Sequence, residues 1–189
     1  MMDAAMRAAT GAILKPGSEA AEAAAPGRQS ASDYLAKIKE SLGETWLPHL
    51  YRERILTTRT RSHKLFAATK QSSVEVQHTL LGVELKVGRR RLLCPDLATA
   101  RYLAVFARAG CTEVAVPYDI TRISLFADEL ESSWHRMLLL IEHLAGERQA
   151  SFRSRLRSLL VGKVRDEIEE AGAGTAIPQF NQNTRQRRK

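Results

Sequence analysis

The chain has 189 residues, of which 44% are hydrophobic and 26% charged, a balance typical of a soluble globular protein. Its 29 Lys and Arg residues against 21 Asp and Glu give a net charge of +8 at pH 7, which favours polyanionic partners such as nucleic acid. Cys94 and Cys111 belong to no CxxC or Cys/His cluster, which excludes the usual zinc and disulfide frameworks and predicts reduced, packed thiols. No apolar run approaches the ~20 residues needed to cross a bilayer, so we expect no membrane insertion and a cytoplasmic location.

Composition divides the chain into three parts. Residues 1–30 mix Ala, Gly, Pro and Ser without an apolar period, which predicts a flexible leader. Residues 31–172 carry periodic apolar positions and are expected to form a single globular domain. Residues 173–189 lose that period and end in a run of basic residues, which predicts a basic flexible tail.

Two helices are predicted at the start of the domain. The first lies in SASDYLAKIKESLG, where Ser32 or Asp33 can cap the helix and Gly43 suits its C-terminal end. The second has Pro48 in its first turn. Their apolar faces are Leu35, Ile38 and Leu42 in the first helix, and Trp46, Leu50, Tyr51 and Ile55 in the second.

The period changes to two in VEVQHTLL and VELKV, which predicts a hairpin with one apolar face. A tight loop at Leu81-Gly82 would set three cross-strand pairs: Leu80 with Val83, His78 with Leu85, and Val76 with Val87. His78 is therefore expected to be a hydrogen-bonded core histidine rather than a ligand. A second turn at Gly88-Arg89 would return RRLLC beside VELKV.

A helix is predicted from a cap at Asp96 to Gly110, followed by a buried strand in EVAVP. Strand, helix and strand would then form a βαβ unit in which LLC and VAV pair in parallel. Two long helices follow, from about residue 119 to 145 and from about 148 to 170. The predicted fold class is α+β, or α/β, with a small mixed sheet between two N-terminal and two C-terminal helices.

Basic residues concentrate in three places: a first group around residues 51–64, a turn of three arginines, and the C-terminal end. The members singled out are Arg52, Arg54, Arg59, Arg61 and Lys64 in the first group, Arg89, Arg90 and Arg91 in the turn, and Arg185, Arg187, Arg188 and Lys189 in the tail. Such cations suit a phosphate backbone because each neutralised phosphate releases counterions. Tyr51 and His63 could stack on the bases of a single strand.

Each basic group alone is equally compatible with an ordinary solvated face. The three together favour a non-catalytic protein that associates with nucleic acid. RNA is placed ahead of DNA because no segment resembles the recognition helix of a duplex reader.

Glu84 and Lys86 form an ExK pair in an alternating strand, downstream of Glu75 and followed by a helix and a buried strand. Over residues 45–117 this order resembles the core of the PD-(D/E)xK nuclease superfamily, with Glu75 in place of the usual upstream aspartate. The resemblance implies a Mg²⁺-dependent nuclease in which Glu75 and Glu84 hold the metal and Glu84 and Lys86 are catalytic. The alternative for these residues is a charged sheet surface, which needs no cofactor.

The C-terminal helices support a third hypothesis. Their leucine stripes, if exposed, would make the protein an interaction module that binds a protein partner or a second copy of itself.

Overall fold

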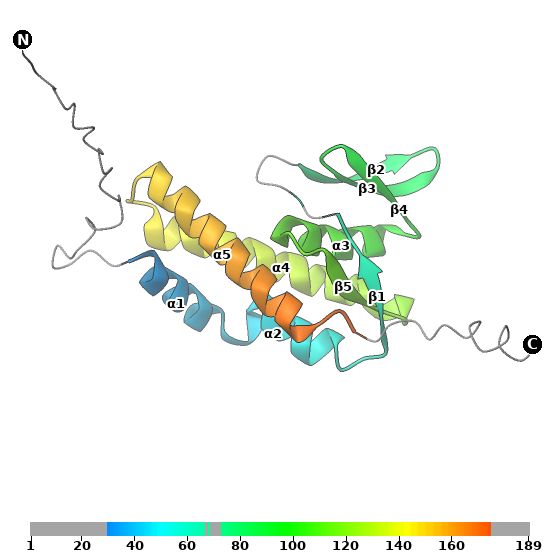
Figure 1. Ribbon diagram of the computed structural model, residues 1–189, viewed down its shortest axis with the longest axis horizontal. Helices are drawn as coiled ribbons and strands as arrows, with labels where there is room; N and C mark the ends of the chain where they lie inside the picture. Colours follow the sequence, from blue (N-terminus) through cyan, green and yellow to red (C-terminus); the bar gives the residue numbers. More distant parts are fainter. Residues whose placement is uncertain (1–29, 67, 69–72, 175–189) are drawn as a thin grey trace, which may run out of the picture.

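The structure, a computed structural model, describes residues 30–66, 68 and 73–174 (Figure 1). The predicted leader up to residue 29 and the predicted tail from residue 175 lie outside the described residues. The elements follow in the order α1 (Ala31–Leu42), α2 (Leu47–Leu50), β1 (Thr60–Lys64), β2 (Val74–Thr79), β3 (Gly82–Val87), β4 (Arg90–Cys94), α3 (Leu97–Ala109), β5 (Glu113–Pro117), α4 (Ile120–Ala145) and α5 (Ala150–Ala171). The α+β class is thus confirmed.

The first helix begins earlier than predicted. Ser30 is its N-cap, and Asp33 completes a capping box by accepting the Ser30 N–H at 2.8 Å. A cap at Ser32 or Asp33 was therefore wrong, because only Ser30 has a carboxylate three residues later to accept its amide. Gly43 ends the helix with φ +48°, and Pro48 lies in the first turn of α2, both as predicted. A π-helical turn, Tyr51–Ile55, extends α2.

Strands β2, β3 and β4 form an antiparallel three-stranded sheet. The β2–β3 turn is Leu80–Leu81, so Val76 faces Leu85 and the predicted pairing was wrong by two residues. An even shift leaves every side chain on the same face, so the alternation of apolar residues could not tell the two registers apart. The Thr79 hydroxyl, which accepts the Leu81 N–H at 3.3 Å, stabilises the observed turn.

The second hairpin was predicted correctly. Val87 faces Arg90 across the Gly88-Arg89 turn, and Gly88 has a left-handed φ of +57°. Leu85 and Val87 are buried, on the face of the sheet that packs on α3. His78 is exposed and is not a core histidine, because β2 is an edge strand and His78 lies next to its outer turn.

The predicted parallel pairing of LLC with VAV is wrong, and so is the single mixed sheet. Strand β5 pairs antiparallel with β1 in a separate two-stranded sheet, with Ser62 opposite Ala115. Sequence reasoning missed β1 because TRSHK contains no hydrophobic residue to reveal an alternation.

The other edge of β5 is closed by two tyrosines. The Ala115 N–H donates to the Tyr51 hydroxyl at 2.8 Å, and the Tyr102 hydroxyl donates to the Ala115 carbonyl at 2.6 Å. These bonds occupy the groups that a parallel β4 would have used, which explains why β4 pairs only with β3. Burial raises the pKa of Tyr51 to about 12, so its hydroxyl stays protonated.

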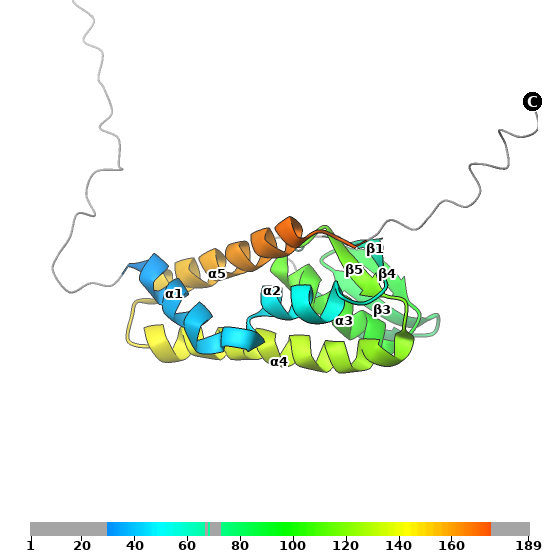
Figure 2. The ribbon, with the colours of Figure 1, turned by 90° about the horizontal axis from the view of Figure 1, so that it is seen from below.

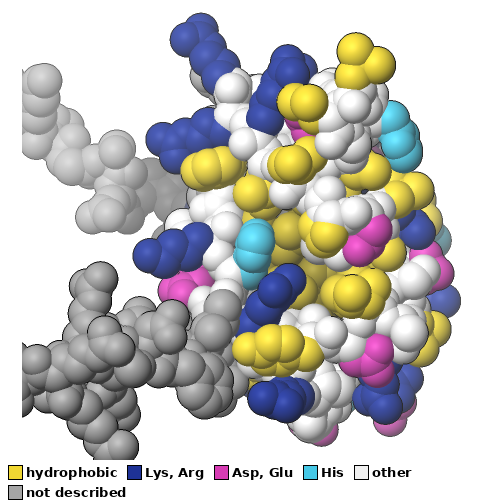
Figure 3. Space-filling model, turned by 90° about the vertical axis from the view of Figure 1, so that its right-hand side faces the viewer, with side chains coloured by type: hydrophobic (Ala, Val, Ile, Leu, Met, Phe, Trp, Pro, Cys, Tyr) yellow, Lys and Arg dark blue, Asp and Glu magenta, His cyan; other side chains and the backbone are white. Residues whose placement is uncertain are grey.

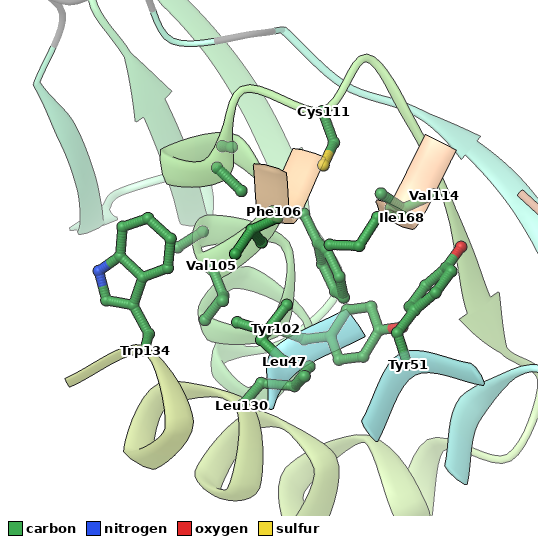
Figure 4. Packing of buried hydrophobic residues seen from close by; sticks show 14 of the residues in the cluster. Leu47, Tyr51, Tyr102, Val105, Phe106, Cys111, Val114, Leu130, Trp134 and Ile168 are labelled. Carbon is green, nitrogen blue, oxygen red and sulfur yellow. The ribbon is translucent and has the colours of Figure 1, made fainter. Parts of the chain in front are cut away.

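Helix α3 is the centre of the fold, between the three-stranded sheet and α4, while α5 and α1 pack alongside (Figures 1 and 2). Figure 4 shows the core, to which α2, α3, α4 and α5 contribute Leu47, Phe106, Leu130 and Ile168. Both cysteines are free and buried, as predicted, and burial raises the pKa of Cys111 to about 12. No helix of the described part is long and apolar enough to span a membrane.

Candidate nucleic-acid interface

Strand β1 carries Arg61 and Lys64 of the candidate contacts, and Arg59 directly precedes it. Its side chains alternate between a face with buried Thr60 and a face with Arg61 and His63, opposite Val116 and Val114 of β5. We call Arg59, Arg61, His63 and Lys64 the basic row, in which Lys64 lies on the Thr60 face of β1 and Arg61 and His63 on the other. None of its three cations, Arg59, Arg61 and Lys64, forms an ion pair with an acidic residue of the described part of the chain.

Arg61 and His63 are half-buried, two residues apart on one face of β1. The Arg61 Nε and His63 Nε2 atoms are buried and have no hydrogen-bond partner among the described residues. Burial lowers the pKa of His63, and the charge of Arg61 lowers it further. An imidazole is thus held next to a guanidinium on one face of β1, and the other N–H groups of the guanidinium are the ones that an anion could use.

The start of the basic row meets an exposed ring. The Arg59 guanidinium lies 5.2 Å from the centre of the Tyr118 ring, which is 42% exposed. The Tyr118 N–H donates to the Arg59 carbonyl at 3.0 Å, so the backbone fixes the two residues side by side. This pair combines a cation with a flat apolar surface.

The far end of the basic row meets the arginine turn. The Arg90 guanidinium lies 4.9 Å from the centre of the half-buried Phe66 ring, two residues beyond Lys64. Arg89 is exposed in the same turn. The structure therefore places an arginine of the turn against the ring that follows the first basic group in the sequence.

The described part of the chain ends against β1. A Cβ atom on Gly174 would lie 2.4 Å from the Thr60 hydroxyl, so only glycine fits at this contact. The Tyr51 hydroxyl donates to the Gly172 carbonyl at 2.7 Å and anchors this segment. Arg185, Arg187, Arg188 and Lys189 lie outside the described residues, but the segment that carries them starts beside β1.

Other predicted contacts are engaged within the fold. Arg52 donates to the Glu167 carbonyl at 3.2 Å and lies 3.6 Å from Glu170, and Arg54 lies 3.4 Å from Glu129. Tyr51 is fully buried, so the expectation that it stacks on bases is wrong.

The ExK residues form two ion pairs on the outer face of the three-stranded sheet. Lys86 Nζ lies 3.6 Å from Glu75, its cross-strand neighbour, and Arg91 lies 3.5 Å from Glu84. A hydrogen bond from Ser73 and the charge of Lys86 lower the pKa of Glu75. Among the described residues there is no group of three or more His, Cys, Asp or Glu side chains that could hold a metal ion.

Two rings of this interface, Tyr118 and Phe66, were not predicted. Tyr118 lies in a segment, Pro117 to Asp119, that reads as an ordinary helix-start turn. Phe66 follows a strand that the sequence did not reveal. A ring directly after a strand, near an arginine, was the available signal, but it depends on knowing that β1 and β5 pair.

Comparison with protein-family models, with curated proteins and with solved structures found no match.

Proposed function

We propose that this protein binds nucleic acid without cleaving it, through the basic row and the cations that meet its two ends. The observation that carries the proposal is the position of β1 between the arginine turn and the end of the described chain. Its far end leads to Phe66, which contacts Arg90 of the arginine turn, and its start contacts Gly174, from which the basic tail continues. Arg59, Arg61 and Lys64 therefore lie in or beside one strand about 13 Å long, at ~3.3 Å per residue, and Arg90 packs on the ring that follows it.

The charge state of these cations supports phosphate binding. A cation that already pairs with a carboxylate gains little from a phosphate, whereas an unpaired one releases counterions from the nucleic acid. Arg59, Arg61 and Lys64 belong to the second class, and so do Arg89 and Arg90 within the described residues. Arg52, Arg54 and Arg91 belong to the first class and are expected to contribute less.

The pairing of the carboxylates supports binding without cleavage. A metal-dependent nuclease needs carboxylates that converge on a cation. Glu75 and Glu84 instead lie beside Lys86 and Arg91, which supports the charged sheet surface over the nuclease.

The test is the salt dependence of binding in the full-length chain. Replacing Arg59, Arg61 and Lys64 by Gln should lower the affinity for nucleic acid and reduce the slope of log K against log salt by about 2, at ~0.7 to 0.9 per lost phosphate contact. The control replaces Lys37, Arg136 and Arg157, three exposed cations on α1, α4 and α5, by Gln; of these, Arg157 lies 3.6 Å from Glu142. Both variants lose three charges, so equal effects in fluorescence anisotropy would contradict the assignment to β1.

A further inference from the structure

The basic row has an arginine–aromatic pair at each end. Arg59 covers Tyr118 at its start and Arg90 covers Phe66 beyond its end. A surface that bound only phosphates would need cations but no aromatic rings, because a ring does not contribute to the binding of a phosphate. Proteins bind unstacked bases with aromatic rings and guanidinium groups, because a base can stack on the flat surface of either.

The end of the molecule that includes Tyr118 is also apolar. Among the described residues, six of the nine exposed large hydrophobic side chains belong to the β2–β3 turn, the end of β4, the start of α3 and the β5–α4 junction; they are Leu80, Leu81, Leu93, Leu97, Tyr118 and Ile120. Figure 3 looks at this end and shows hydrophobic side chains gathered around a hollow, with Lys and Arg side chains beside them. A hollow of this character can take a flat, weakly polar group that carries a charged backbone.

Single strands and duplexes differ in what they can offer to such a surface. A duplex presents phosphates outside and encloses its bases in the stack, so it could use the cations but not Tyr118, Phe66 or the apolar hollow. An unpaired strand can place its phosphates along the basic row and turn its bases onto the rings.

We propose that this end of the molecule is a site for unpaired nucleotides, with one base stacked on Tyr118 and the neighbouring phosphates bound by Arg59 and Arg61. The site rests on the proposed nucleic-acid function and specifies its substrate class. The sugar is not part of the argument, because stacking and phosphate binding do not require the 2′-hydroxyl.

The experiment measures fluorescence anisotropy of the full-length protein with labelled oligonucleotides of about 12 residues, a length within the usual range of single-strand sites. The probes are one RNA and one DNA of the same sequence, each as a single strand and as a blunt duplex. We expect the single strand to bind tighter than its duplex in both sets. Whichever single strand binds more tightly, RNA or DNA, indicates whether the site prefers ribose or deoxyribose.

Three variants test the role of the ring. Tyr118→Ala should weaken single-strand binding about 5- to 150-fold, the range for one stacked base, with little change in the salt slope. Tyr118→Phe keeps the ring and should bind like the unaltered protein. Leu139→Ala, which removes a more exposed apolar side chain in the second half of α4, is the control for general loss of surface.

Failure of this inference and failure of the proposed function give different results. Duplex binding as tight as single-strand binding, or unchanged single-strand binding by Tyr118→Ala, would overturn the site for unpaired nucleotides while leaving nucleic-acid binding in place. No binding of any probe at low salt would overturn both, and would assign the apolar end to a protein partner.

Discussion

At the scale of single residues, the most unusual feature is an imidazole and a guanidinium that share one face of β1. Both side chains keep a buried nitrogen without a partner among the described residues. A buried polar atom that forms no hydrogen bond lowers the stability of the folded state. The two unpartnered nitrogens are therefore expected to destabilise the folded chain.

The pKa of His63 makes this cost measurable. Because burial and Arg61 lower the pKa of folded His63 below its ordinary value of 6.5, the unfolded chain takes up the proton first as the pH falls. The protein should therefore lose stability as the pH drops from 7 through 6.5 towards 5. His63→Gln should show a smaller loss across this window in urea unfolding at several pH values.

An exposed histidine supplies the control for this experiment. His135→Gln removes an exposed imidazole from the surface of α4 and controls for the loss of a histidine as such. If His63→Gln and the unaltered protein lose stability in the same way as the pH falls, the burial of His63 does not contribute to the pH dependence of stability and the prediction is wrong.

At the scale of elements, the decisive feature is the strand β5. It is buried along Val114–Pro117, pairs with β1 on one edge and receives two tyrosine hydroxyls on the other. A strand without a second neighbour usually leaves backbone groups unpaired, and the tyrosines fill this role from α3 and the π-helical turn.

Removal of one hydroxyl should therefore destabilise the protein without changing its shape. Tyr102→Phe leaves the buried Ala115 carbonyl without a donor, which should lower the free energy of unfolding by about 1–3 kcal/mol. Tyr118→Phe removes an exposed hydroxyl and should cost far less. Chemical denaturation of both variants makes the comparison, and equal stabilities would show that the Ala115 carbonyl does not depend on Tyr102.

The same strand shows how far sequence reasoning could reach. Helices and hairpins were predictable because local signals mark them: Asp96 and Gly110 bound α3, and Gly88 closes the second hairpin. The neighbour of β5 was not, because a βαβ order favours parallel pairing and nothing in TRSHK reads as a strand.

The candidate interface was predictable to a similar degree. Clustering identified the cations, but which of them pair with acids depends on contacts between residues far apart in the chain. Arg54 with Glu129 and Arg59 with Tyr118 are such contacts. The leucines of the C-terminal helices divide in the same way: Leu130, Leu156 and Leu160 lie in the core, whereas Leu125, Leu139 and Leu159 are exposed. The hypothesis that such leucines bind a protein partner stays a prediction.

At the scale of the whole molecule, the cations differ in whether they pair with acidic residues. On the helices, cations such as Arg101 and Arg153 pair with acids, whereas the basic row does not. The described chain ends at Gly174 beside β1, and the four tail cations follow later in the sequence. We propose that they contribute to the same nucleic-acid contact as the basic row.

The last prediction tests whether the tail and the basic row bind the same nucleic-acid strand or act independently. Replacing Arg185, Arg187, Arg188 and Lys189 by Gln in the full-length chain should weaken binding of a short single strand and lower its salt slope by about 3, at ~0.7 per phosphate. If the tail and the basic row contact the same short strand, combining these changes with those at Arg59, Arg61 and Lys64 should lower the slope by about 5. Anisotropy titrations over a salt series measure this slope directly. A tail variant that binds the short strand with an unaltered slope would instead mean that the tail acts elsewhere, and that the ligand is held by β1 alone.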